Sequence, residues 1–357
     1  MRFLTSPRAS ATRHLLGPKT TRLRNSRDHH VDLTTFDTRY KHELLNVRTT
    51  NMRFLLSIFV SLVCVTPATA HAQIFVGELI GATGRVGEYT MSGAPVNPAL
   101  ISEGVRPIEL ALSGNNLFVL NLSASSSVGT IGEYTTSGAT INPTLISGLN
   151  HLPFTIAVSG DKLFVANAGD STVGSGTISL FTTSGETVNR ALISGLTSPL
   201  GIAISGDRLF VANSLIDTVG EYTTSGDTVN PALISGLTDL TGIAVSGERL
   251  FLTSGFNGTV SEYTTSGALV NPEFLSGLGN PSGIAVSGHN LFVVDINNGK
   301  IGKYTTGGET VDADLISLSS PTSIAVGPAT VPEASSAWLL LLLGLATVLG
   351  FKSWKTA

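Results

Sequence analysis

The sequence predicts an all-β protein, namely a six-bladed β-propeller with one blade closed by N- and C-terminal strands, followed by a C-terminal hydrophobic helix. The 357 residues include 39 glycines and only 13% charged residues, and β-branched residues between glycine-rich turns are typical of strands. A Ser-Gly landmark also recurs at intervals of about 40 residues, each interval holding four short apolar runs. Its glycines are Gly114, Gly160, Gly206, Gly247 and Gly288, with a degenerate copy at Gly327.

One repeat, residues 241–281, shows how each unit is built. Its apolar runs GIAVS, RLFLT, TVSEYTT and EFLSG are separated by the turn sequences GE, FNG and SG. Turn residues between short apolar runs indicate four antiparallel strands. The first run is almost wholly apolar and predicts an inner strand that is buried on both faces. The third run alternates, as an outer strand does.

The arrangement of the repeats predicts how the ring closes. The inner strand occurs six times, at residues 109–112, 155–158, 201–204, 242–245, 283–286 and 323–326. The first unit opens at Ile74 without an inner strand, and the last unit stops after one. We therefore expect 323–326 to complete the blade that begins at Ile74, with Ile324 packed between neighbouring blades. Such closure removes the exposed edges of an open sheet.

An aromatic residue recurs once per blade, in the third strand. Because a once-per-repeat side chain is usually part of the contact between repeats, we expect these residues to pack between blades instead of forming a ligand site. They are Tyr89, Tyr134, Phe181, Tyr222, Tyr263 and Tyr304.

The N-terminal part of the chain predicts export. Residues 52–72 begin with Met52-Arg53, continue with a long apolar run and end in the small-x-small pattern Ala70-His71-Ala72, which is a signal peptide with its cleavage site. Residues 1–51 lack apolar periodicity and are interpreted as a non-native or disordered extension. Cleavage would also remove Cys64, the single cysteine, so the 73–327 body would contain no thiol or disulfide.

The C-terminal part predicts a sorting or transmembrane tail. Residues 328–337 form a linker that contains the motif Val331-Pro332-Glu333, and residues 338–357 form an apolar run that ends with Lys352 and Lys355. This arrangement resembles the PEP-CTERM sorting signal, although Ala334 stands where the motif has its second proline. The resemblance implies a membrane partner, an exosortase-like sorting peptidase, and a final location at the cell surface or in the extracellular matrix.

The repeats themselves resemble NHL-repeat propellers over about 250 residues. The resemblance rests on the sequence Pro-x-Gly-Ile-Ala before the landmark, as at Pro199 and Pro281, and on the run Leu-Phe-Val-Ala-Asn that ends at Asn213. It implies a fold more firmly than an activity, because related propellers include binding proteins, lactonases and lyases. The body carries eight Lys and Arg against twenty Asp and Glu, so we expect no nucleic-acid partner.

Polar residues at the end of the second strand are the candidate metal ligands. Carboxylate and amide oxygens of this kind suit a divalent cation such as Ca²⁺, and gluconolactonase-like propellers hold a cation with a similar set. The competing interpretation is that these side chains hydrogen-bond turns, in which case the protein needs no cofactor. The candidates are Glu78, Asn121, Asn167, Asn213 and Asp295, with Ser254 at the equivalent position of the fifth repeat.

Two functions remain open on the sequence. The first is a non-catalytic interaction scaffold of the cell surface or matrix, with an extracellular polysaccharide or protein as its partner. The second is a secreted metal-dependent lactonase or lyase. The near-identity of the repeats favours the scaffold, because a catalytic pocket requires individual blades to differ. A cluster of three or more convergent polar side chains at the channel mouth would favour the enzyme.

The signal peptide gives the first testable prediction. Cleavage after Ala72 should leave Gln73 as the first residue of the exported protein, because Ala70 and Ala72 supply the small side chains that the peptidase needs. N-terminal sequencing of the exported protein measures this directly. Recovery of residues 1–51 on the exported chain would contradict it.

Overall fold

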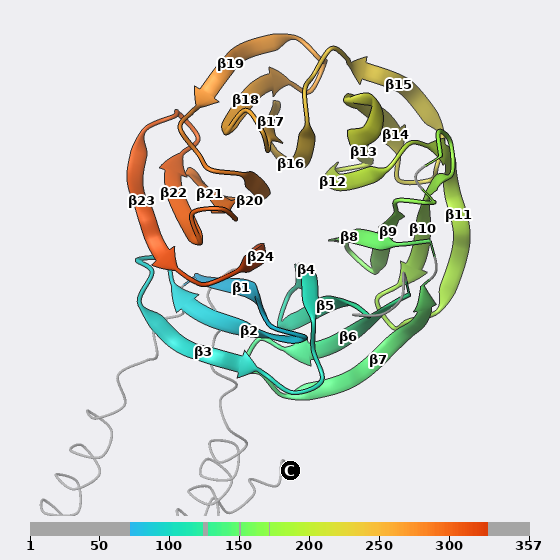
Figure 1. Cartoon of the computed structure of the whole chain (residues 1–357). Helices are drawn as coiled ribbons and strands as arrows, with labels where there is room; N and C mark the ends of the chain where they lie inside the picture. The colour runs from blue at the N-terminus through green and yellow to red at the C-terminus, as the bar shows by residue number, and fades with distance from the viewer. Residues whose placement is uncertain (1–71, 124–127, 150, 171, 328–357) are drawn as a thin grey trace, which may run out of the picture. The chain divides into compact units, whose positions relative to one another are not determined.

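The computed structural model describes residues 72–123, 128–149, 151–170 and 172–327. Within these residues six four-stranded antiparallel sheets stand around a central channel like the blades of a propeller (Figure 1). The predicted all-β propeller of six blades is therefore confirmed. The tail at 338–357 lies outside the described residues, and within them no helix is long and apolar enough to cross a membrane.

The strands are numbered in chain order and are given for each blade from the channel outward. Blade I comprises β24 (Pro321–Gly327), β1 (Gln73–Ile80), β2 (Thr83–Thr90) and β3 (Pro95–Ile101), and blade II comprises β4 (Pro107–Ser113), β5 (Asn116–Leu122), β6 (Gly129–Thr135) and β7 (Thr140–Leu149). Blade III comprises β8 (Pro153–Ser159), β9 (Lys162–Asn167), β10 (Gly176–Thr182) and β11 (Thr187–Leu196), and blade IV comprises β12 (Pro199–Ser205), β13 (Arg208–Asn213), β14 (Thr218–Thr223) and β15 (Thr228–Ile234), with the short 3-10 turn η2 (Ser214–Ile216) after β13. Blade V comprises β16 (Leu240–Ser246), β17 (Arg249–Ser254), β18 (Thr259–Thr264) and β19 (Leu269–Leu275), and blade VI comprises β20 (Pro281–Ser287), β21 (Asn290–Asp295), β22 (Lys300–Thr305) and β23 (Thr310–Ser317).

The ring closes through blade I, as the sequence predicts. Strand β24 pairs with β1 in antiparallel register, with Val76 opposite Ile324 and Gln73 opposite Gly327. Ile324 is 5% exposed and belongs to one apolar cluster with Phe292 of blade VI. The first and last strands of the body thus form one sheet and seal its contact with the preceding blade.

The Ser-Gly landmark is the tight turn between the first and second strand of a blade. The glycine at its centre has a positive φ, for example +57° at Gly114 and +62° at Gly206, which only glycine adopts without steric cost. Each landmark therefore fixes the register of the hairpin that it joins. This local requirement explains why the repeat was visible in the sequence.

Each pair of neighbouring blades is joined by two aromatic side chains. A phenylalanine in the second strand, such as Phe75, packs on the following blade, where it meets an aromatic residue of the third strand, such as Tyr134. The predicted role of the third-strand aromatics between blades is confirmed, because all six lie in such clusters. The six phenylalanines are fully buried, and they are Phe75, Phe118, Phe164, Phe210, Phe251 and Phe292.

The outermost strand begins earlier than the sequence indicates. The sequence predicts the fourth strand of blade V at 273–277, whereas β19 covers Leu269–Leu275 and includes an Asn-Pro pair. Asn271 Oδ1 accepts a hydrogen bond from the Glu273 N–H (3.1 Å), and the register with β18 shifts at this point. A proline that reads as a turn is tolerated here because an edge strand leaves its outer N–H groups unpaired, and the bulge also hinders pairing with another chain.

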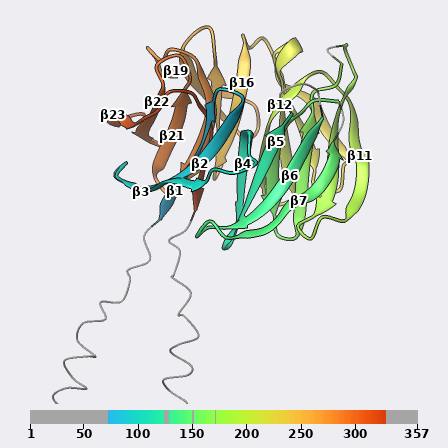
Figure 2. The ribbon, with the colours of Figure 1, turned by 60° about the horizontal axis from the view of Figure 1, so that its bottom comes forward.

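The two faces of the disc carry different connections. We call the face with the connections from second to third strand, such as residues 81–82 and 255–258, the entrance face, and the opposite face the terminal face. Because Gln73 pairs with Gly327, the body begins and ends on the terminal face (Figure 2).

Closure generates the second prediction. Ile324→Asp should place a carboxylate in the contact between blades VI and I and lower the free energy of unfolding by several kcal/mol. Truncation after Pro321 should be at least as damaging, because it removes most of β24 and opens a sheet edge. Denaturant unfolding measures both effects, and truncation after Thr330 is the control that keeps β24. Equal stability of all four proteins would refute the closure.

Candidate binding cavity on the channel axis

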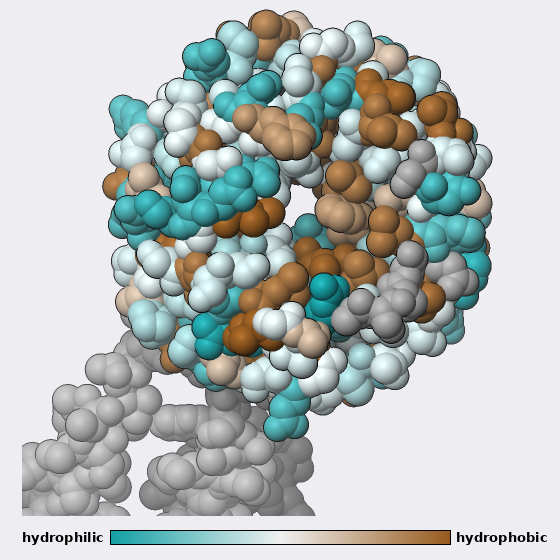
Figure 3. Space-filling model, in the orientation of Figure 1, coloured by the Kyte–Doolittle hydropathy of each residue, from teal (hydrophilic) through white to brown (hydrophobic). Residues whose placement is uncertain are grey.

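A cavity of about 310 Å³ lies in the channel among the six inner strands. Figure 3 shows the hollow at the centre of the disc, with hydrophobic side chains along its lower and right margins. Most of the lining comes from the second, third and fourth residues of the inner strands, so every blade contributes to it, and Leu122 and Ile296 complete it. The six inner strands face one another across the same axis. A residue that differs between two blades therefore makes two sides of the cavity wall differ.

The second residue of the inner strand divides the cavity wall into two halves. Three consecutive blades, II to IV, place apolar side chains there, and the other three place hydroxyl groups. The residues are Ile108, Phe154 and Leu200 on the apolar side, and Thr241, Ser282 and Thr322 on the hydroxyl side. The cavity is therefore apolar on one side and polar on the other, although the surrounding repeats are nearly identical.

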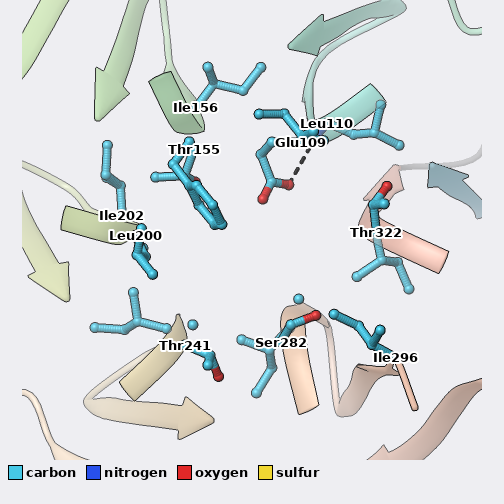
Figure 4. Close-up of a pocket in the computed structure, with 18 of the residues that line it drawn as sticks. Glu109, Leu110, Thr155, Ile156, Leu200, Ile202, Thr241, Ser282, Ile296 and Thr322 are labelled. Carbon is cyan, nitrogen blue, oxygen red and sulfur yellow. Dashed lines mark hydrogen bonds between the residues drawn. The ribbon is translucent and has the colours of Figure 1, made fainter. Parts of the chain in front are cut away.

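Glu109 is the one acidic side chain that lines the cavity. It occupies the third position of its strand, where the other blades have Thr155, Ser323 or glycine, and its carboxyl group points into the hollow (Figure 4). Its Oε1 accepts a hydrogen bond from the Leu110 N–H (3.0 Å). Burial among the inner strands raises the pKa of Glu109 to about 8, against a smaller opposing effect of the Leu110 hydrogen bond.

The hydroxyl side forms hydrogen bonds between blades. Thr241 Oγ1 donates to the Pro281 carbonyl of the next blade (2.7 Å), and Thr322 Oγ1 donates to the Pro107 carbonyl (3.0 Å). Ser282 Oγ is shielded from solvent and has no hydrogen-bond partner. Thr241 Oγ1 also shares a hydrogen bond with Thr253 Oγ1 (2.9 Å), whereas the lone pairs of Thr322 Oγ1 remain for the cavity.

The five predicted metal candidates are buried, and four of them bind the chain that leads into the inner strand of their own blade. Asn121 Oδ1 accepts from the Arg106 N–H (2.9 Å), and Asn213 Oδ1 accepts from the Thr197 N–H (3.3 Å). Asp295 accepts from the N–H groups of Gly279 (2.8 Å) and Asn280 (3.0 Å).

Glu78 and Ser254 also bind the chain that leads into an inner strand, whereas Asn167 binds a side chain of its own blade. Glu78 accepts from the Ser319 N–H (2.9 Å) and also forms an ion pair with Arg85 (2.6 Å). Asn167 donates to Ser179 Oγ (2.9 Å), and Ser254 Oγ donates to the Thr238 carbonyl (2.6 Å). None of these hydrogen bonds joins one candidate to another. Within the described part of the chain no three His, Cys, Asp or Glu side chains are grouped as metal ligands, so the Ca²⁺ site stays a prediction.

The entrance face also carries exposed apolar side chains. Blades II to V each place at least one on the connection from second to third strand, Ile80 ends β1 on the same face, and Phe154 adds another at the cavity wall. Their exposed fractions are 91% for Phe256, 78% for Val173, 55% for Leu215, 50% for Ile80, 47% for Ile216, 40% for Phe154 and 38% for Val128.

Sequence reasoning missed Glu109 as a functional candidate. It counted the residue as the first of an inner strand, although a signal was present in the aligned repeats. A glutamate replaces the glycine, threonine or serine of the other five blades at that position. The arrangement around the residue could not be read from spacing, because the cavity side chains come from six inner strands that are far apart in the chain.

Comparisons with known proteins agree on the fold. No protein-family model and no curated protein matches the chain. Among solved structures, a chain of a nidogen/laminin complex superposes with a TM-score of 0.60 at 16% identity, covering 73% of this chain and 99% of that one. A candidate 6-phosphogluconolactonase of Bacteroides fragilis gives a TM-score of 0.51 at 12% identity, with the same two coverages. The likeness shows the fold alone.

The raised pKa of Glu109 gives the third prediction. The folded protein holds this proton up to a pH of about 8, whereas the unfolded chain releases it near the ordinary value of 4.5. Stability should therefore fall as pH rises between these values, by up to about 1.4 kcal/mol per unit. Glu109→Gln should remove that loss. The stability of the variant should therefore rise relative to that of the wild type as pH increases from 5 to 8.

Thermal unfolding at pH 5, 6.5 and 8 measures the effect. The matched control is Glu186→Gln, which makes the same chemical change at an exposed position in the β10–β11 hairpin. If the melting temperatures of the wild type and of Glu109→Gln change with pH in parallel, Glu109 is not a neutral acid buried in the cavity.

Proposed function

We propose that the protein is an exported, non-catalytic interaction scaffold of the cell surface or extracellular matrix, which binds a protein partner on its entrance face. The observation that carries the proposal is the set of exposed apolar side chains on that face. Exposed apolar side chains that gather on one face mark interaction sites in soluble proteins, and aromatic side chains contribute most to such interfaces. Phe256, with 91% of its surface exposed, is the natural anchor.

The position of the chain ends supports the same proposal. The body starts and stops on the terminal face, where Gln73 pairs with Gly327. The motif Val331-Pro332-Glu333 and the apolar run at 338–357 follow directly in the sequence. A membrane anchor or a sorting peptidase acting on that tail would engage the terminal side, which leaves the entrance face free for a partner.

A secreted metal-dependent lactonase or lyase is the alternative function. The convergence of Glu109 with the hydroxyls of Thr241, Ser282 and Thr322 favours it, because these are distinct polar groups facing one cavity. A metal would require oxygen ligands from elsewhere on the entrance side, and Glu78 and Asp295 are the carboxylates proposed for that role. Lactone hydrolysis that is abolished by a chelator and restored by Ca²⁺ would establish the alternative in place of the scaffold.

The scaffold proposal gives the fourth prediction. A triple variant with Phe256→Ser, Val173→Ser and Leu215→Ser should lose most of the partner that is cross-linked to the wild-type protein on intact cells, because burial of apolar surface drives such association. The control variant carries Val96→Ser, Val229→Ser and Val311→Ser. These valines are exposed by 52 to 56% but lie on the outer strands.

Cross-linking followed by mass spectrometry measures the partner that each protein retains. The proposal expects one protein to be retained by the wild type and by the control but not by the triple variant. Equal retention by all three proteins, or no protein retained by the wild type, would refute it.

A further inference from the structure

The cavity wall differs between blades where the rest of the repeat does not. Apolar side chains at Ile108, Phe154 and Leu200 face a half-ring of hydroxyl groups at the equivalent positions, and Glu109 stands between the two halves. The phenylalanine and aromatic pairs that join the blades lie farther out, although Thr241 and Thr322 also hydrogen-bond the neighbouring blade. A ligand with one polar end and one apolar side would use both halves.

The polar half of the cavity presents mainly hydrogen-bond acceptors. Thr322 uses its hydrogen on a carbonyl group of the next blade, so its lone pairs remain for a ligand. Thr241 donates in the same way but also shares a hydrogen bond with the Thr253 hydroxyl, which leaves it less acceptor capacity. Glu109 contributes two further oxygens, of which Oε1 already accepts from the Leu110 N–H. A group that donates several hydrogen bonds fits such a wall better than a group that accepts them.

The charge of the cavity also favours a ligand that donates hydrogen bonds, and in particular a cation. Glu109 is the only titratable side chain among the described residues that line it, and no ion pair among the described residues includes Glu109. Arg106 lies nearby in the chain and is not among the lining residues, although its Nη1 donates to the carbonyl of Leu122, which does line the cavity (3.3 Å). A cation that enters the cavity would therefore meet an acid that forms no ion pair within the described part of the chain.

We propose that the cavity binds a primary alkylammonium group. The ammonium contacts the Glu109 carboxylate and the hydroxyl oxygens, and the alkyl chain lies along the apolar half. An ammonium supplies three donors in a compact group on a flexible apolar stem, which matches both sides of the wall. The same chemistry is offered by a lysine side chain of a protein partner or by a free aliphatic amine, and the lysine form rests on the proposed function.

Isothermal titration calorimetry of the purified full-length protein tests the inference with n-hexylammonium and its neutral counterpart 1-hexanol. At pH 7.5 hexylammonium should bind at least about tenfold more tightly than hexanol. Glu109→Gln should reduce that preference to about onefold, whereas the exposed control Glu186→Gln should keep it. Because Glu109 must lose its proton to pair with the ammonium, affinity should also rise from pH 6 to 8 in the wild type and stay constant in Glu109→Gln.

Three results would overturn the inference. They are equal binding of hexanol and hexylammonium, unchanged hexylammonium affinity in Glu109→Gln, and binding of a neutral sugar such as glucose more tightly than hexylammonium. Circular dichroism of each variant confirms that it is folded, and Glu109→Gln preserves the shape of the side chain.

A lysine peptide with apolar flanking residues separates the two sources of the ammonium. If the partner supplies the lysine, the triple variant of the entrance face should weaken peptide binding and leave hexylammonium binding unchanged. If hexylammonium binds and the triple variant does not change peptide binding, the result would support an ammonium site in the cavity. The same result would contradict the protein-binding role of the entrance face. Failure of both ligands would contradict the cavity itself.

Discussion

The contact between neighbouring blades is the interaction on which the whole body depends. A four-stranded sheet buries its apolar residues only when other sheets cover both of its faces, and here each blade offers a phenylalanine to the next blade and an aromatic residue to the preceding one. Six blades therefore need six contacts. The last of these exists only because β24 pairs with β1 and brings Ile324 against Phe292. Without that pairing two blades would each expose one face and an edge to solvent.

Closure also creates the cavity. It holds six inner strands at a fixed distance from one axis, so that the second and third residues of each strand meet across the channel. These positions differ between blades, although some of them also hold neighbouring blades together, as Thr241 and Thr322 do through hydrogen bonds. The division between Phe154 and its apolar neighbours and Thr241 and its hydroxyl neighbours shows variation of this kind, as does Glu109.

The fold was predictable because its signals are local and repeated. The turn glycines, the apolar second strand and the aromatic third strand each occur once per blade, and the missing inner strand of the first unit revealed the closure. The start of the outer strand is predicted too far along the chain because Asn271-Pro272 signals a turn. Only a strand at the edge of a sheet can contain this pair. Glu109 was overlooked as a site because its surroundings come from other blades. Asn121, Asn213 and Asp295 were noticed for their regular positions, and the hydrogen bonds of these residues show a structural role in holding the entry to the inner strand.

Hydrogen exchange of the body, read by mass spectrometry, tests the closure of the ring most directly. The account predicts that the backbone amides of 323–326 exchange as slowly as those of 283–286, the equivalent inner strand of blade VI, because both lie between a paired strand and the channel core. Exchange of 323–326 within seconds, with 283–286 still protected, would mean that β24 does not close the ring. The cavity would then lack one of its six walls.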